Sequence, residues 1–104
     1  MRQLSWCWRS HAYASAMPIT PATVERLRNA VGAEFVLEAP IERHLYAKDA
    51  GLRRNPVSLV VLPASTQEVA AVLRIAAEDG IDVVPRGGGS GLTGGAVPTG
   101  DALV

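Results

Sequence analysis

The sequence predicts an α+β chain in which one amphipathic helix precedes an α/β-type strand–helix–strand unit and a glycine-rich loop. Three observations lead to this prediction. Apolar residues recur at helical spacing in the first third of the chain, and β-branched runs occupy residues 57–62 and 81–84. A second helical stripe separates those two runs. Directly after the second run, residues 85–98 hold six of the chain's ten glycines.

Length and composition limit what the chain can be. With 104 residues it forms one small domain at most, and 48% of them are hydrophobic. Ten basic and ten acidic residues cancel, so nothing indicates nucleic acid or an anionic membrane. The single cysteine excludes an internal disulfide and provides no metal cluster. No apolar run reaches the roughly 18 residues that a transmembrane helix needs.

The first 17 residues differ from the rest. They contain both tryptophans, Cys7 and His11 but no acidic residue, and they lack the apolar core of a secretory signal. We interpret them as a disordered extension, or as non-native sequence translated upstream of a start at Met17. An organelle transit peptide is a weaker alternative. Residues 18–54 are then an N-terminal helical segment, and residues 55–104 begin the main domain.

Local signals define the first helix. Thr20 can cap it, Pro21 suits its first position and Gly32 ends it. Its apolar positions are Val24, Leu27 and Val31. After it, residues 35–37 form a short apolar run, either one turn or a brief strand, and residues 40–54 are predicted to be irregular.

The strand–helix–strand unit follows Asn55–Pro56. Residues 57–62 lack alternation, which is typical of a strand covered on both faces. Ser65 and Glu68 form a capping box, and Gly80 ends the helix. The expected buried stripe comprises Val69, Val72, Leu73, Ala76 and Ala77, while Asp79 and Asp82 are expected to be solvated. The order of elements predicts parallel pairing of the two strands through a right-handed crossover, and residues 102–104 predict a third strand.

The glycine loop is most simply explained as a phosphate-binding loop, because closely spaced glycines let a ligand approach backbone N–H groups. A flexible linker is the alternative. The P-loop pattern fails because Ala96 and Val97 follow Gly95 where Lys and Ser or Thr are required. Residues 89–94 match GxGxxG, but Pro98 and Gly100 forbid the helix that a nicotinamide-type dinucleotide site needs.

Residues 60–63, 65–69 and 83–98 together resemble the start of the FAD-binding domain of the vanillyl-alcohol oxidase / p-cresol methylhydroxylase (PCMH) superfamily. Within it, the chain most resembles the branch that contains the FAD-linked glycolate oxidases and the D-lactate dehydrogenases. The resemblance implies that the loop holds the FAD pyrophosphate through backbone N–H groups. The implied cofactor-binding residues are Pro85, Arg86, Gly87, Gly88, Gly89, Ser90, Gly91, Gly94 and Gly95. A His near Ser90 marks covalent flavin attachment in this superfamily, so its absence implies non-covalent FAD.

Several side chains have two interpretations. Arg86 either faces a phosphate oxygen or pairs with an acid. Ser90 and Thr93 either donate to phosphate or cap local turns. Tyr46 and Asp49 resemble a Tyr-x-x-Asp that precedes the FAD domain in the same superfamily. We interpret them as packing or pairing at the domain boundary, with contact to flavin or substrate as the alternative. His44 is interpreted as a surface or packing residue.

No catalytic residue and no metal ligand can be assigned in this chain. The resemblance implies the N-terminal part of a larger cytoplasmic, or peripherally membrane-attached, FAD-dependent oxidoreductase. Such an enzyme would oxidise a 2-hydroxy acid such as glycolate or D-lactate, with partner subunits of an oxidase complex. The chain would then end inside a sheet with an exposed apolar edge. The alternatives are a nicotinamide-dependent enzyme, a non-catalytic phosphate- or nucleotide-binding module, and another flavin reaction such as ether-lipid synthesis or cell-wall precursor reduction.

Overall fold

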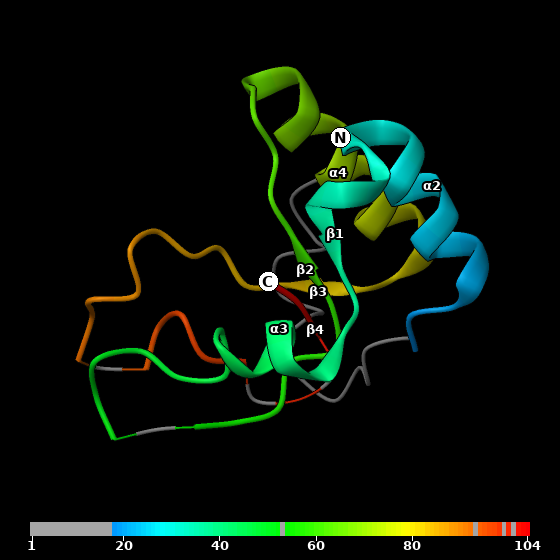
Figure 1. The fold of residues 1–104 in the computed structure, drawn as a ribbon. Helices are drawn as coiled ribbons and strands as arrows, with labels where there is room; N and C mark the ends of the chain where they lie inside the picture. The colour runs from blue at the N-terminus through cyan, green and yellow to red at the C-terminus, as the bar shows by residue number, and fades with distance from the viewer. Residues whose placement is uncertain (1–17, 53, 93, 99, 101) are drawn as a thin grey trace.

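The computed structural model describes residues 18–104 except 53, 93, 99 and 101 (Figure 1). The expected extension over residues 1–17 and the expectation for Thr93 therefore lie outside the described residues. The elements are α2 (Pro21–Val31), a 3₁₀ turn η1 (Ala33–Phe35), β1 (Val36–Leu37), α3 (Pro40–His44), β2 (Val60–Val61), α4 (Thr66–Asp79), β3 (Asp82–Val83) and β4 (Ala102–Leu103).

The strands combine into a mixed sheet with β4 at its centre. β1 pairs antiparallel with β2, and β3 pairs parallel with β4. A parallel bridge between Leu59 and Leu103 joins the two pairs, supported by hydrogen bonds from the Val61 N–H to the Val104 carbonyl and from the Val104 N–H to the Leu59 carbonyl. The first two strands of the strand–helix–strand unit are thus not neighbours, because the third strand lies between them. The third strand, β4, is therefore an inner strand of the sheet, and its residues Ala102 and Leu103 are buried.

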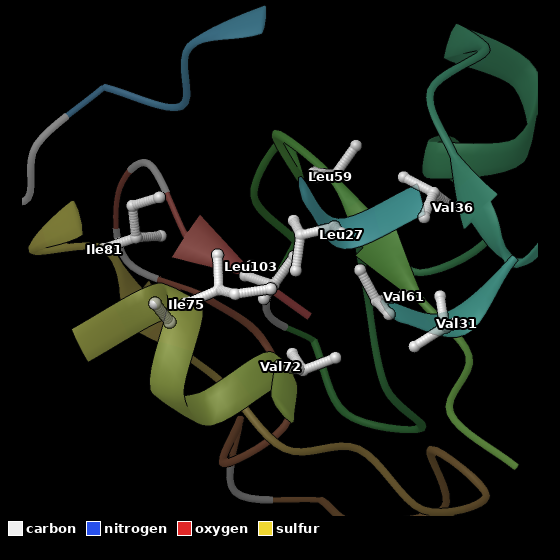
Figure 2. Close-up of a cluster of buried hydrophobic side chains, with 10 residues drawn as sticks. Leu27, Val31, Val36, Leu59, Val61, Val72, Ile75, Ile81 and Leu103 are labelled. Atoms are coloured by element: carbon white, nitrogen blue, oxygen red, sulfur yellow. The ribbon is translucent and has the colours of Figure 1, made fainter. Parts of the chain in front are cut away.

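Both faces of the sheet are covered, as the unbroken apolar run predicted. Leu59 and Val61 join a core cluster with α2 and α4, whereas Val60 between them joins a second cluster with Ala47 and Val57. The same alternation separates Leu103 from Val104. The helices therefore pack on one face, shown in Figure 2, and residues from the 46–57 region pack on the other.

Helix α4 has the predicted ends but a rotated buried face. The Ser65 hydroxyl accepts the Glu68 N–H at 3.2 Å, and Gly80 closes the helix in the left-handed conformation with φ 69°. The Glu68 carboxylate accepts from the Ala64 N–H rather than from Ser65. The buried residues are Val72, Ile75 and Ala76. The predicted stripe was wrong in including Val69, Leu73 and Ala77, which are exposed because α2 contacts α4 from the Ile75 side.

Helix α2 begins and ends as predicted and is tied to the end of α4. The Thr20 hydroxyl accepts the Thr23 N–H, and Leu27 and Val31 are buried. The buried Thr23 hydroxyl donates to Asp79 Oδ2 at 2.6 Å, and Arg26 donates to Asp79 Oδ1 at 3.0 Å. The expectation that Asp79 is solvated was therefore wrong. Arg26 also pairs with Glu78, and this hydrogen bond raises the pKa of the guanidinium above its usual value.

The segment between β1 and β2 is more ordered than predicted. Residues 40–44 form the short helix α3, which Pro40 begins, where the sequence predicted irregular structure. From there to Val57 the chain follows the outer face of the sheet before it enters β2. This route brings residues 46–55 beside the glycine loop (Figure 1).

Candidate functional site

The glycine loop, residues 85–98, begins where β3 ends. The Val84 N–H donates to the Leu103 carbonyl at 2.8 Å, which fixes the point of departure at the carboxyl end of a parallel strand. Open α/β sheets bind their ligands at that end of their strands. Every residue that the sequence predicted as cofactor-binding lies in this loop and is described by the structure.

Residues 46–55, which we call the anchor segment, hold the loop in place. Asp49 is 5% exposed, and its carboxylate links the two segments. The Gly94 N–H donates to Oδ2 at 3.0 Å, and the Gly51 N–H donates to Oδ1 at 2.7 Å. The Ala50 N–H donates to the Gly91 carbonyl at 3.1 Å. One buried carboxylate and one backbone hydrogen bond therefore fix the second half of the loop.

Both ends of the loop are held as well. At the start, Arg86 Nη1 donates to the Lys48 carbonyl at 2.8 Å, and its guanidinium carbon lies 5.4 Å from the centre of the Tyr46 ring. At the end, Asn55 Nδ2 donates to the Pro98 carbonyl at 2.9 Å. Among the described residues, no carboxylate forms an ion pair with Arg86. The sequence analysis expected Arg86 to face a phosphate oxygen or to pair with an acid. In the described part of the chain it binds the anchor segment and no acid.

Four of the six glycines of the loop fall into two groups. Gly89 and Gly94 have positive φ, 70° and 81°, and a Cβ on Gly89 would lie 2.2 Å from Arg86 Nη2. Both positions need glycine for the conformation of the loop itself. By contrast, Gly87 and Gly88 have no positive φ, and a Cβ on either would meet nothing within 4 Å. The described chain gives no internal reason for glycine at these two positions.

The same stretch carries free backbone donors. Within the described part of the chain, the N–H groups of Gly87, Gly88, Gly89 and Ser90 donate to no other group. Successive free N–H groups with one residue in the left-handed region form a concave anion-binding arrangement. Pro85 has no N–H, so it shapes the entry to the loop without donating. The arrangement suits a phosphate or diphosphate that approaches the backbone closely.

Other kinds of site receive no support from the described residues. After Gly95 the chain forms a turn rather than the helix on which a nicotinamide-type site places its pyrophosphate. No group of three or more metal-ligating side chains lies together in the described ranges. None of the described helices is both long and apolar enough to cross a membrane.

The glycine loop thus lies at the carboxyl end of a parallel strand, carries free N–H groups and is not followed by a helix in the described residues. Comparison with known proteins gives the family. Residues 57–104 match the family described as FAD binding domain. In fold, the described part of the chain matches the start of a PCMH-type FAD-binding domain, as its resemblance to that superfamily implied.

Relatives share both the loop region and the segment before it. A D-2-hydroxyglutarate dehydrogenase of Xanthomonas citri pv. viticola is 38% identical over 87 residues, which is 83% of this chain and 18% of that protein. Glycolate oxidase subunit GlcD of Bacillus subtilis is 33% identical over the same shares. A D-lactate dehydrogenase of Archaeoglobus fulgidus is 52% identical over 46 residues, 44% of this chain and 10% of the relative. The chain thus spans less than a fifth of the length of these relatives.

Solved structures agree on the fold. A 4-ethylphenol oxidase from Gulosibacter chungangensis superposes with a TM-score of 0.68 at 27% identity, over 79% of this chain and 17% of that one. An alkyldihydroxyacetonephosphate synthase superposes with a TM-score of 0.72 over 90% of this chain and 20% of that one, at 19% identity. The second likeness concerns the fold alone.

Sequence reasoning located the loop but missed how it is held. The Tyr-x-x-Asp pattern indicated pairing at a boundary without a partner for Asp49, and nothing indicated that Asn55 reaches Pro98. Gly51 was not singled out, although a Cβ there would lie 2.6 Å from the Leu92 carbonyl oxygen. The available signals were the Tyr-x-x-Asp pattern and the polar residues around Gly51, directly before the predicted strand.

Proposed function

We propose that the glycine loop binds the diphosphate of FAD and that the protein is an FAD-dependent oxidoreductase acting on a 2-hydroxy acid of the glycolate or D-lactate type. The bound flavin supplies the hydride-accepting chemistry, and the residues of this chain bind and orient it. The proposed binding residues are Pro85, Arg86, Gly87, Gly88, Gly89, Ser90, Gly91, Gly94 and Gly95. Residues 55–104 would begin the FAD-binding domain, with residues 18–54 as the helical segment before it.

One observation carries the binding proposal. Gly87 and Gly88 have ordinary backbone conformations and open space where a Cβ would stand. Glycine at two such positions raises the conformational entropy of the unfolded chain without any gain in the folded one. A ligand whose surface comes within reach of the backbone explains both, and the free N–H groups beside them favour an anionic one.

Two further features of the cofactor and substrate follow from the same loop and from the relatives. Ser90 is exposed, and no His stands near it in the sequence. We therefore propose that the flavin is held non-covalently. The substrate class rests on the names of the relatives, which are dehydrogenases or oxidases of D-lactate, D-2-hydroxyglutarate and glycolate. Mixing the FAD-loaded protein with each of these three acids under anaerobic conditions, and following loss of flavin absorbance, would identify the substrate.

The binding proposal is tested with Gly87→Ala and Gly88→Ala. We expect each to weaken FAD affinity at least about tenfold, because the added methyl group occupies the space of a phosphate oxygen and one lost charge-assisted contact is of that size. Binding is followed by titrating the ¹⁵N-labelled chain with FAD and recording the amide signals of residues 86–91, since this method measures weak affinities.

Gly100→Ala is the matched control, because a Cβ there also meets nothing within 4 Å and the position lies outside the loop. All three variants should keep or slightly raise the urea midpoint of the unchanged chain, because alanine lowers the conformational entropy of the unfolded state. Unchanged FAD affinity in Gly87→Ala and Gly88→Ala, or equal loss in Gly100→Ala, would show that the loop does not approach the diphosphate.

A further inference from the structure

Asp49 is an unusual neighbour for an anion-binding loop. Its carboxylate is buried, Oδ2 accepts the Gly94 N–H, and the same oxygen lies 3.9 Å from where a Gly91 Cβ would stand. A negative charge at this place opposes binding of a diphosphate through Coulomb repulsion. Its presence therefore calls for a function that outweighs this cost.

The hydrogen bonds of Asp49 supply that function. Each carboxylate oxygen accepts one backbone N–H, from Gly51 in its own segment and from Gly94 in the loop, 45 residues further along the chain. Hydrogen bonds to an ionised acceptor are about twice as strong as neutral ones. Both donors are glycines, and Gly94 adopts φ 81°, which other residues seldom reach.

We propose that Asp49 is a positioning residue for the FAD site, which sets the shape of the glycine loop before the cofactor arrives. The inference rests on the proposed function. In this inference Gly94 contributes to the FAD site by holding the shape of the loop, because its N–H is already donated to Asp49. The free N–H groups of residues 87–90 are left to donate to the diphosphate. Preorganisation of this kind removes an ordering cost from binding.

The chemistry of Asp49 makes the test specific. Asparagine keeps the shape of aspartate but offers one acceptor oxygen and a donating amide in place of the second. In Asp49→Asn, one of the two glycine N–H groups therefore loses its acceptor and faces another donor. We expect faster hydrogen exchange at Gly94 or Gly51 without ligand, and FAD affinity lowered by about 10- to 100-fold, the loss typical of a hydrogen bond to a charged group.

Asp82→Asn is the matched control, since Asp82 is exposed on β3 outside the loop. A second variant covers the case in which Asp49→Asn does not fold. Gly51→Ala keeps the carboxylate but places a Cβ 2.6 Å from the Leu92 carbonyl oxygen, so it should displace the loop and weaken FAD binding in the same way.

The readouts separate this inference from the proposed function. Faster exchange confined to residues 49–55 and 86–96, with weaker FAD binding and an unchanged urea midpoint, supports the positioning role. A general loss of stability would not produce this combination of results. Unchanged exchange and affinity in both variants would overturn it. Failure of the full-length protein to bind FAD would overturn the proposed function, whereas the exchange data without ligand would still decide whether Asp49 fixes the loop.

Discussion

At the residue scale, the contact between Thr23 and Asp79 holds the two helices together. The hydroxyl is buried, donates to the carboxylate at 2.6 Å and lies 3.0 Å from the Thr20 hydroxyl. Thr23→Val keeps the shape but removes the donor, so we expect the free energy of unfolding to fall by about 1–2 kcal/mol in urea titrations. Thr66→Val, at an exposed position of α4, is the control and should change it less. Equal midpoints for Thr23→Val and the unchanged chain would refute the prediction.

At the element scale, α4 depends on its first cap. Ser65 is exposed, and its hydroxyl accepts the Glu68 N–H, which otherwise has no intrahelical acceptor. We expect Ser65→Ala to lower the free energy of unfolding by about 1 kcal/mol. Ser65→Asp should restore it, because aspartate caps equally well and its charge suits the helix N-terminus. Thermal unfolding monitored by circular dichroism measures both variants, and a stable Ser65→Ala would show that the helix is fixed by packing alone.

Elements also differ in how far the sequence predicts them. The ends of α2 and α4 follow from Thr20, Gly32, Ser65 and Gly80, which act on neighbours within four residues. The position of β4 between β2 and β3 depends on contacts between residues far apart in the chain, such as Leu59 with Leu103, and no local pattern encodes it. For the same reason the buried face of α4 was misplaced, since α2 decides which side of a broadly apolar helix is covered.

The site shows the same division. The glycine cluster and the strand before it predict a diphosphate loop, because the glycines that give the backbone its conformational freedom are close together in the sequence. In the sequence, β2, α4 and β3 separate the anchor segment from the loop. The hydrogen bonds from Gly94 to Asp49 and from Asn55 to Pro98 therefore form only once the sheet brings the two segments to one edge. Sequence thus located the proposed ligand surface, and the fold revealed its support.

At the scale of the whole molecule, the sheet separates two apolar clusters that pack against different parts of the chain. The helix cluster contains Leu27, Leu59, Val72 and Leu103 (Figure 2), and the second cluster contains Ala47, Val57 and Val60 beneath the anchor segment. Because successive strand residues point to opposite faces, Val60 supports the anchor segment while its neighbours Leu59 and Val61 support the helices. Stability of the helices and order of the loop can therefore be altered separately.

Val60→Ala and Val72→Ala test this separation. Both side chains are buried, at 1% and 6% exposure, so each truncation should cost about 2 kcal/mol of lost burial and cavity formation. Hydrogen exchange should distinguish them. We expect Val60→Ala to speed exchange mainly in residues 46–55 and 86–96 and to weaken FAD binding, and Val72→Ala to speed exchange mainly in α2 and α4. Uniformly faster exchange in both variants would contradict the prediction, because it would mean that the chain unfolds only as one unit and that the loop does not open separately from the helices.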